Sequence, residues 1–147
     1  MKKISVYYWI FTGIIVAFEG LLPALTFNSP LAKQGITHLG YPDYFRVLLT
    51  LYKIAGSLIL ILPFFKGRIK EWAYAGFTFD FISAAVSLIA VDGFNPQVAT
   101  PLVTLAILAA SYYFYHKRRR LMQEQYAKTP SGLSTDRKKD GQPYVSA

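Results

Sequence analysis

The sequence predicts an all-α protein: a transmembrane four-helix bundle followed by a disordered polar C-terminal tail. The chain has 147 residues, and 53% of them are hydrophobic, which is more apolar surface than one soluble core of this size can bury. The apolar residues form four runs of about 18 to 22 residues each, near the 20 that a helix needs to cross a bilayer. Helix is the expected form, because a lone strand would leave its backbone groups unpaired in lipid.

The first two runs are expected as helices at about 4–25 and 44–65. A cleaved signal peptide is a poor interpretation of the first run, because the run is long, contains Glu19 and lacks a small-x-small site at its end. The connection between the two runs, roughly Thr26 to Asp43, has room for a short helix lying on the surface.

The other two runs are expected at about 72–91 and 98–115, with Pro101 in the first turn of the last helix, where proline costs little. Residues 1–116 are therefore predicted to form one transmembrane domain. The polar composition of 117–147 cannot bury a core, so this segment is predicted to be a basic, largely disordered cytoplasmic tail.

The basic residues predict the direction of the chain. They number 16, against 8 acidic residues, and most flank the runs on one side of a four-times-crossing chain. They lie before the first run, between the second and third, and after the fourth: Lys2, Lys3, Lys66, Arg68, Lys70 and Lys117 to Arg120. Because cytoplasmic loops carry an excess of Lys and Arg, we expect a multi-pass cell-membrane protein with both termini in the cytoplasm.

The partners expected from this charge pattern are membrane lipids. A high pI also invites a nucleic-acid interpretation, but no groove-reading motif accompanies the basic residues, so no nucleic-acid partner is expected. The run from Lys117 to Arg120 instead indicates a stop-transfer signal in contact with anionic lipid head groups. A homo-oligomer or a partner membrane protein is left open.

The chain has no cysteine, which excludes disulfides, thiolate metal sites and iron–sulfur ligation within it. Its two histidines are His38, in the predicted outer loop, and His116, at the inner membrane edge. Neither has a second histidine at ligand spacing, so haem ligation is not expected. We therefore expect no cofactor, no metal site and no catalytic residue set.

Three acidic or basic residues lie well inside the apolar runs, away from their ends: Glu19, Lys53 and Asp80. Each costs about 2.5 to 3.5 kcal/mol to insert, so each needs a partner or a wet cavity. The helical rise places them roughly 9, 12 and 16 Å from the outer ends of their helices. A lysine between two carboxylates is the expected pairing, and it leaves one negative charge for a proton or a ligand to balance.

Small and hydroxyl residues accompany these charges along the helices, where they allow close approach and hydrogen bonding. The predicted ligand-binding or intramembrane polar cluster therefore consists of Glu19, Lys53, Asp80, Ser57, Ser83 and Ser87. An equally simple interpretation is that the charges only set which helices pack together and in what register. Both interpretations stay open at this point, and the last helix is expected to serve mainly in packing.

Several blocks of the sequence resemble the DoxX-like membrane proteins over roughly the first 115 residues. The blocks are Leu39-Gly40-Tyr41-Pro42-Asp43-Tyr44-Phe45, Tyr52-Lys53-Ile54-Ala55-Gly56, Leu62-Pro63 and, most specific, Arg68-Ile69-Lys70-Glu71-Trp72-Ala73-Tyr74-Ala75-Gly76-Phe77. The resemblance implies a four-helix bundle and little about activity. Where many relatives have Ser-His near the end of the third helix, this chain has Ser87-Leu88, so no role for that histidine is carried over.

The leading functional hypothesis is a non-catalytic accessory or ligand-binding membrane module, because the chain offers no metal, thiol or nucleophile set. A second is a subunit of a quinone-linked membrane oxidoreductase. It follows only from the resemblance, since the family takes its name from a subunit associated with thiosulfate:quinone oxidoreductase. A third is a small proton or solute carrier that uses the charges within the runs, with a pore between two subunits because four helices leave little room for one.

Overall fold

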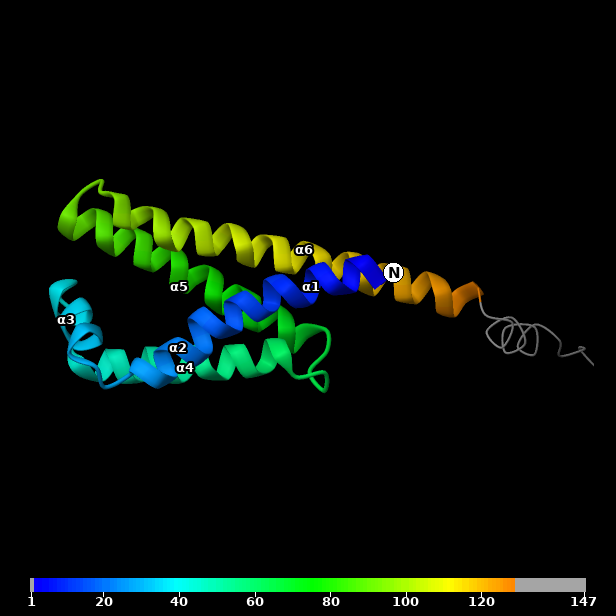
Figure 1. Cartoon of the computed structure of the whole chain (residues 1–147), viewed down its shortest axis with the longest axis horizontal. Coiled ribbons are helices and arrows are strands. Elements are labelled where there is room, and N and C mark those ends of the chain that lie inside the picture. Colours follow the sequence, from blue (N-terminus) through cyan, green and yellow to red (C-terminus); the bar gives the residue numbers. More distant parts are fainter. Residues whose placement is uncertain (1, 129–147) are drawn as a thin grey trace, which may run out of the picture.

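The structure is a computed structural model that describes residues 2–128, and its regular elements over that range are all helices. The first long helix combines α1 (Lys2–Ile15), a π-helical segment η1 (Val16–Leu21) and α2 (Leu22–Thr26). Within the described range, four helical stretches have the length and apolar composition of membrane spans: Lys2–Thr26, Asp43–Ile61, Arg68–Asp92 and Pro96–Lys128. The predicted all-α four-helix fold is confirmed (Figure 1).

The loop after the first long helix contains the predicted short helix, α3 (Pro30–His38). Ser29 caps α3 by accepting a hydrogen bond from the Ala32 N–H at 3.2 Å, and Pro30 occupies the first helical turn, where its missing N–H is harmless. In Figure 1, α3 lies at one end of the bundle, the same end as the turn that follows α5.

The second long helix, α4 (Asp43–Ile61), is shorter than predicted and ends well before residue 65. Pro63 accounts for this end, because a residue before proline is pushed out of the helical region and Leu62 is extended, with ψ of 129°. The third, α5 (Arg68–Asp92), begins earlier than predicted. It follows Gly67, whose φ of +61° gives the chain a sharp turn that a residue with a side chain rarely adopts.

The fourth long helix consists of a short 3₁₀ turn, η2 (Pro96–Val98), and α6 (Ala99–Lys128). It therefore continues into the segment predicted as tail. The residues after His116 are mostly good helix formers, and no proline interrupts them before Pro130. The predicted disorder of the remaining tail concerns residues 129–147, which lie outside the described residues.

The first long helix crosses the bundle diagonally, packing on α6 with its beginning and on α4 with η1 (Figure 1). Hydrogen bonds between hydroxyl groups connect α6 to α1 and α5. Ser111 Oγ on α6 lies 2.9 Å from Thr12 Oγ1 on α1 and 2.9 Å from Tyr74 Oη on α5. Large apolar side chains also cover the outside: Trp72 is 80% exposed and Phe79 71%. Such a surface is stable when lipid surrounds it. The buried apolar core comprises Ile15, Leu60, Ala73, Tyr74, Phe77, Phe81 and Leu108.

Candidate functional site

Glu19 lies in the π-helical segment η1, where the helix makes a wider turn than an α-helix. Pro23 explains the widening. In an α-helix the N–H of residue 23 would donate to the carbonyl of Glu19, but proline has no N–H to donate. The Leu22 N–H reaches back to the Ala17 carbonyl instead, which is the i to i+5 pattern of a π-helix. Single π-turns of this kind occur often at functional sites.

Gly20 brings this segment into close contact with α4. A Cβ atom on Gly20 would lie 2.5 Å from Ser57 Oγ and 2.6 Å from Ser57 Cβ, which is too close for any real side chain. Glycine therefore allows the two backbones to approach, as small residues do where helices pack in membranes. This close contact places η1 beside the middle of α4. Because Gly20 directly follows Glu19, the contact also brings Glu19 near α4.

Lys53, on α4, lies between two carboxylates from the neighbouring helices. Its Nζ donates to Glu19 Oε2 at 2.7 Å and lies 3.1 Å from Asp80 Oδ2 on α5. The side chains are 21% exposed for Lys53 and 15% for each carboxylate. We call these three residues the charged triad. When all three are ionised its net charge is −1.

The packing of α4 on α5 brings Lys53 to Asp80. Gly56 lies one turn after Lys53. A Cβ atom added there would be 2.9 Å from the Phe77 ring, so the packing of α4 on α5 also requires a residue without a side chain. Asp80 Oδ2 is buried and forms an ion pair with Lys53 Nζ. Among the described residues it accepts no well-directed hydrogen bond. The two carboxylates therefore share the one ammonium between them.

Two pockets meet at the triad. A polar pocket of about 390 Å³ has all three triad residues in its wall, together with Gln97, Thr100 and Thr104 from η2 and α6. An apolar pocket of about 460 Å³ shares Lys53 and Asp80 with it and otherwise has mainly apolar and aromatic walls. Its lining includes Phe45, Leu49, Tyr52, Gly56, Ile59 and Phe77. A ligand with a polar end and an apolar body would fit this junction.

The three predicted serines occupy different places. Ser83 lines the apolar pocket beside Asp80. Ser57 is buried against Gly20, and its hydroxyl has no hydrogen-bond partner among the described residues. Ser87 lies further along α5 and shares a 2.8 Å hydrogen bond with Tyr41.

Sequence reasoning missed the contribution of the fourth helix, which was expected to serve mainly in packing. Thr100 and Thr104 are one turn apart and both line the polar pocket, as does Pro101 between them. The signal available in the sequence was this pair of hydroxyl residues at helical spacing in an otherwise apolar run.

The two histidines each face one acidic residue. His38 Nε2 lies 2.7 Å from Asp92 Oδ1 and links α3 to the end of α5. His116 Nε2 lies 3.5 Å from Glu71 Oε1. No group of three His, Asp or Glu side chains suited to a metal ion occurs in the part of the chain that the structure describes.

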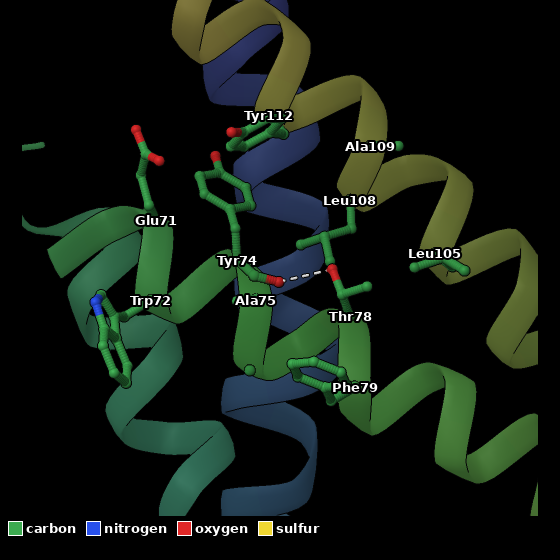
Figure 2. A pocket seen from close by; sticks show the side chains of 11 residues that line it. Glu71, Trp72, Tyr74, Ala75, Thr78, Phe79, Leu105, Leu108, Ala109 and Tyr112 are labelled. Carbon is green, nitrogen blue, oxygen red and sulfur yellow. Dashed lines mark hydrogen bonds between the residues drawn. The ribbon is translucent and has the colours of Figure 1, made fainter. Parts of the chain in front are cut away.

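Another pocket, with a volume of about 860 Å³, lies between α5 and α6 and has no triad residue in its wall (Figure 2). Its walls are almost wholly apolar or aromatic, and Glu71 is its one charged lining residue. The exposed rings of Trp72 and Phe79 border it. An apolar groove on the outer face of a membrane protein is suited to lipid chains rather than to chemistry.

The four long apolar helices define a multi-pass helical membrane protein. The sequence profile of the DoxX-like family matches residues 10–111, and the chain belongs to this family. That range contains the whole charged triad. Searches of curated proteins and of solved structures returned no match.

Proposed function

We propose that the protein is a non-catalytic, ligand-binding membrane module in which the charged triad holds the polar end of an amphipathic ligand. The observation that carries this proposal is the position of Lys53 and Asp80 in the walls of both a polar and an apolar pocket. A site that served only to set helix register would need neither pocket. The apolar pocket accommodates the ligand's hydrocarbon part, and the polar pocket gives its head group access to the triad.

The charges of the triad select the head group. Two carboxylates surround one ammonium, so the site carries an excess negative charge. A protonated amine complements this charge and can donate hydrogen bonds to a carboxylate. An anionic head group would instead meet the two carboxylates in a poorly solvated place. The proposed ligand class is therefore an amphipathic amine.

Replacing Asp80 with Asn is expected to weaken amine binding by roughly tenfold or more, because a hydrogen bond to a charged group contributes about 1.5 to 3 kcal/mol. The measurement is the thermal midpoint of the full chain in nanodiscs titrated with dodecylamine, dodecanol or dodecanoic acid. We expect dodecylamine to raise the midpoint most. Glu124→Gln removes one carboxylate on the exposed end of α6, away from the triad, and is the matched control. Equal shifts for all three compounds, or an unchanged dodecylamine shift in Asp80→Asn, would contradict the proposal.

A carrier of protons or small cations is a second candidate, favoured by the excess carboxylate charge beside a polar pocket. It predicts flux into liposomes containing the purified chain, and loss of that flux in Asp80→Asn. Binding of dodecylamine without any flux would support the ligand-binding module instead.

We also propose that both termini face the cytoplasm. The N-terminus, the loop between α4 and α5, and the basic end of α6 lie toward the same end of the bundle (Figure 1). The basic residues are concentrated there, as on the cytoplasmic side of membrane proteins. Arg46, which lies near the opposite end, is buried and held by Asp43 and the Phe27 carbonyl, so it has a structural role there.

A reporter joined to Ala147 is expected to be active as a cytoplasmic fusion. The same reporter inserted at Gly93, in the turn between α5 and η2, is expected to read as extracytoplasmic and serves as the opposite control. The measurement is the activity of a reporter that works on only one side of the membrane. An extracytoplasmic signal from the Ala147 fusion would overturn the orientation.

A further inference from the structure

A second polar pocket, of about 530 Å³, lies at the other end of the bundle from α3, between the start of the chain, the loop after α4 and the last part of α6. Four of its lining residues are basic, and the pocket's described wall contains no acidic side chain. Aromatic rings fill much of the remaining wall. The basic residues are Lys66, Lys70, Arg118 and Arg119, and the aromatic ones are Tyr8, Trp9, Phe65, Tyr115 and Tyr126.

Lys70 is the innermost of these charges and is only 5% exposed. Its Nζ donates to the Leu60 carbonyl at 2.7 Å and to the Tyr8 hydroxyl at 3.1 Å. Both acceptors are uncharged, and an ammonium has three N–H donors, so one donor remains. A buried charge without an opposite charge is costly, and among the described residues no carboxylate forms an ion pair with Lys70.

The pocket is built by the fold rather than by loose surface side chains. The Gly67 N–H donates to the Tyr115 hydroxyl at 3.2 Å, which holds the loop after α4 on α6. The Arg118 guanidinium lies 5.5 Å from the centre of the Tyr8 ring, and Lys70 Nζ lies 5.7 Å from the same ring. Two cations from different helices therefore converge on one buried aromatic ring in the wall of the pocket.

We propose that this pocket binds a phosphate group, and that the phosphate belongs to the head group of an anionic phospholipid. Arginine and lysine are the side chains that recognise phosphate, and one bound anion would neutralise charges that no described carboxylate balances. The pocket lies where two apolar spans end, so a head group held there can leave its acyl chains along the outer apolar surface. Basic pockets between helices at a membrane boundary are suited to such head groups.

This site is distinct from the charged triad in both place and sign. The triad carries excess negative charge and is proposed to take an amine, whereas the second pocket carries only positive charge. No residue is shared between the walls of the two polar pockets. A failure of either proposal would therefore leave the other unaffected.

Trp9 lines the pocket and can report on the lipid beside it. In a Trp72→Phe protein it is the one remaining tryptophan. The full chain is placed in phosphatidylcholine vesicles that contain a minor fraction of one brominated lipid. This lipid is either brominated phosphatidylglycerol or brominated phosphatidylcholine, and the bromine atoms on its acyl chains quench tryptophan on contact. We expect brominated phosphatidylglycerol to quench Trp9 more strongly than brominated phosphatidylcholine at the same fraction.

Replacing Lys66 and Arg119 with Gln is expected to reduce this preference roughly fivefold for each charge removed, the effect of one basic residue near an anionic surface. Both side chains are exposed, so the variant should fold, which the buried Lys70 would not guarantee. The matched control is the double variant Lys117→Gln, Arg120→Gln. It removes the same amount of charge from exposed residues of α6 that do not line the pocket. We expect the control to keep the preference.

Two results would overturn the proposal in different ways. An equal loss of preference in both double variants would mean general attraction to the membrane surface rather than a site. No preference in the parent protein would mean that the pocket does not bind phospholipid phosphate. Relief of the quenching by inorganic phosphate, with no relief by chloride at equal ionic strength, would support the proposal, because the free ion would then compete with the lipid phosphate for one site.

Discussion

Replacing Lys53 with Met is expected to destabilise the protein by about 3 to 5 kcal/mol, the cost of removing one partner from a buried ion pair. The substitution leaves Glu19 and Asp80 facing each other, each only 15% exposed, without the ammonium that lies 2.7 and 3.1 Å from them. The measurement is reversible unfolding of the full chain in bicelles by SDS. The expected result is an unfolding midpoint at a clearly lower SDS fraction than that of the parent protein.

The matched control for this prediction removes the stranded charges as well. Glu19→Gln and Asp80→Asn combined with Lys53→Met should recover most of the stability, because uncharged groups cost far less to bury than unpaired carboxylates. The triple variant should still fail to bind dodecylamine, which would separate the triad's role in binding from its role in packing. An unchanged midpoint in Lys53→Met alone would show that the triad contributes little to the fold.

Replacing Gly20 with Ala is expected to destabilise the protein by about 1 to 3 kcal/mol, the usual cost of overpacking a tight contact. The new Cβ would lie 2.5 Å from Ser57 Oγ and 2.6 Å from Ser57 Cβ, so the backbone of η1 or α4 has to move. Since Glu19 is the preceding residue, this movement should also lengthen its contact with Lys53 and weaken amine binding. SDS unfolding and the dodecylamine titration measure the two effects.

Gly13 provides the control on the same long helix. A Cβ atom there would meet nothing within 4 Å, so Gly13→Ala should be neutral or slightly stabilising, because alanine favours a helix more than glycine does. Combining Gly20→Ala with Ser57→Gly removes both atoms of the clash and should restore stability. If Gly20→Ala is as stable as Gly13→Ala, the close approach of η1 to α4 is not required.

The number of spans and the identity of the three charges could be predicted from the sequence, because both depend on local composition. A run of about 20 apolar residues is long enough to span the bilayer whatever its neighbours are. An ionisable residue within such a run needs a partner for the same reason. Since the helical rise is constant, the depths of Glu19, Lys53 and Asp80 could be compared before their contacts were known.

The orientation of the helices about their own axes could not be predicted in this way. On α5 the apolar residues have almost no preferred side, so its apolar pattern does not indicate which face meets the bundle interior. By its sequence position Lys70 belongs to a basic cluster outside the apolar runs. It lies instead at the start of α5, turned inward and 5% exposed, with the Leu60 carbonyl as its nearest acceptor. Only the placement of α4 and α1 around it decides this burial.

The sequence by itself determined that this chain is a four-helix membrane protein with one lysine and two carboxylates among its apolar runs. The tertiary structure decided that Lys53 lies between those carboxylates, that Ser57 faces Gly20 while Ser87 turns to Tyr41, and that the fourth helix lines the polar pocket. The physical reason is the range of the interactions. Hydropathy and helical rise are properties of one segment, whereas an ion pair or a pocket exists only once separate helices have packed at a particular rotation and distance.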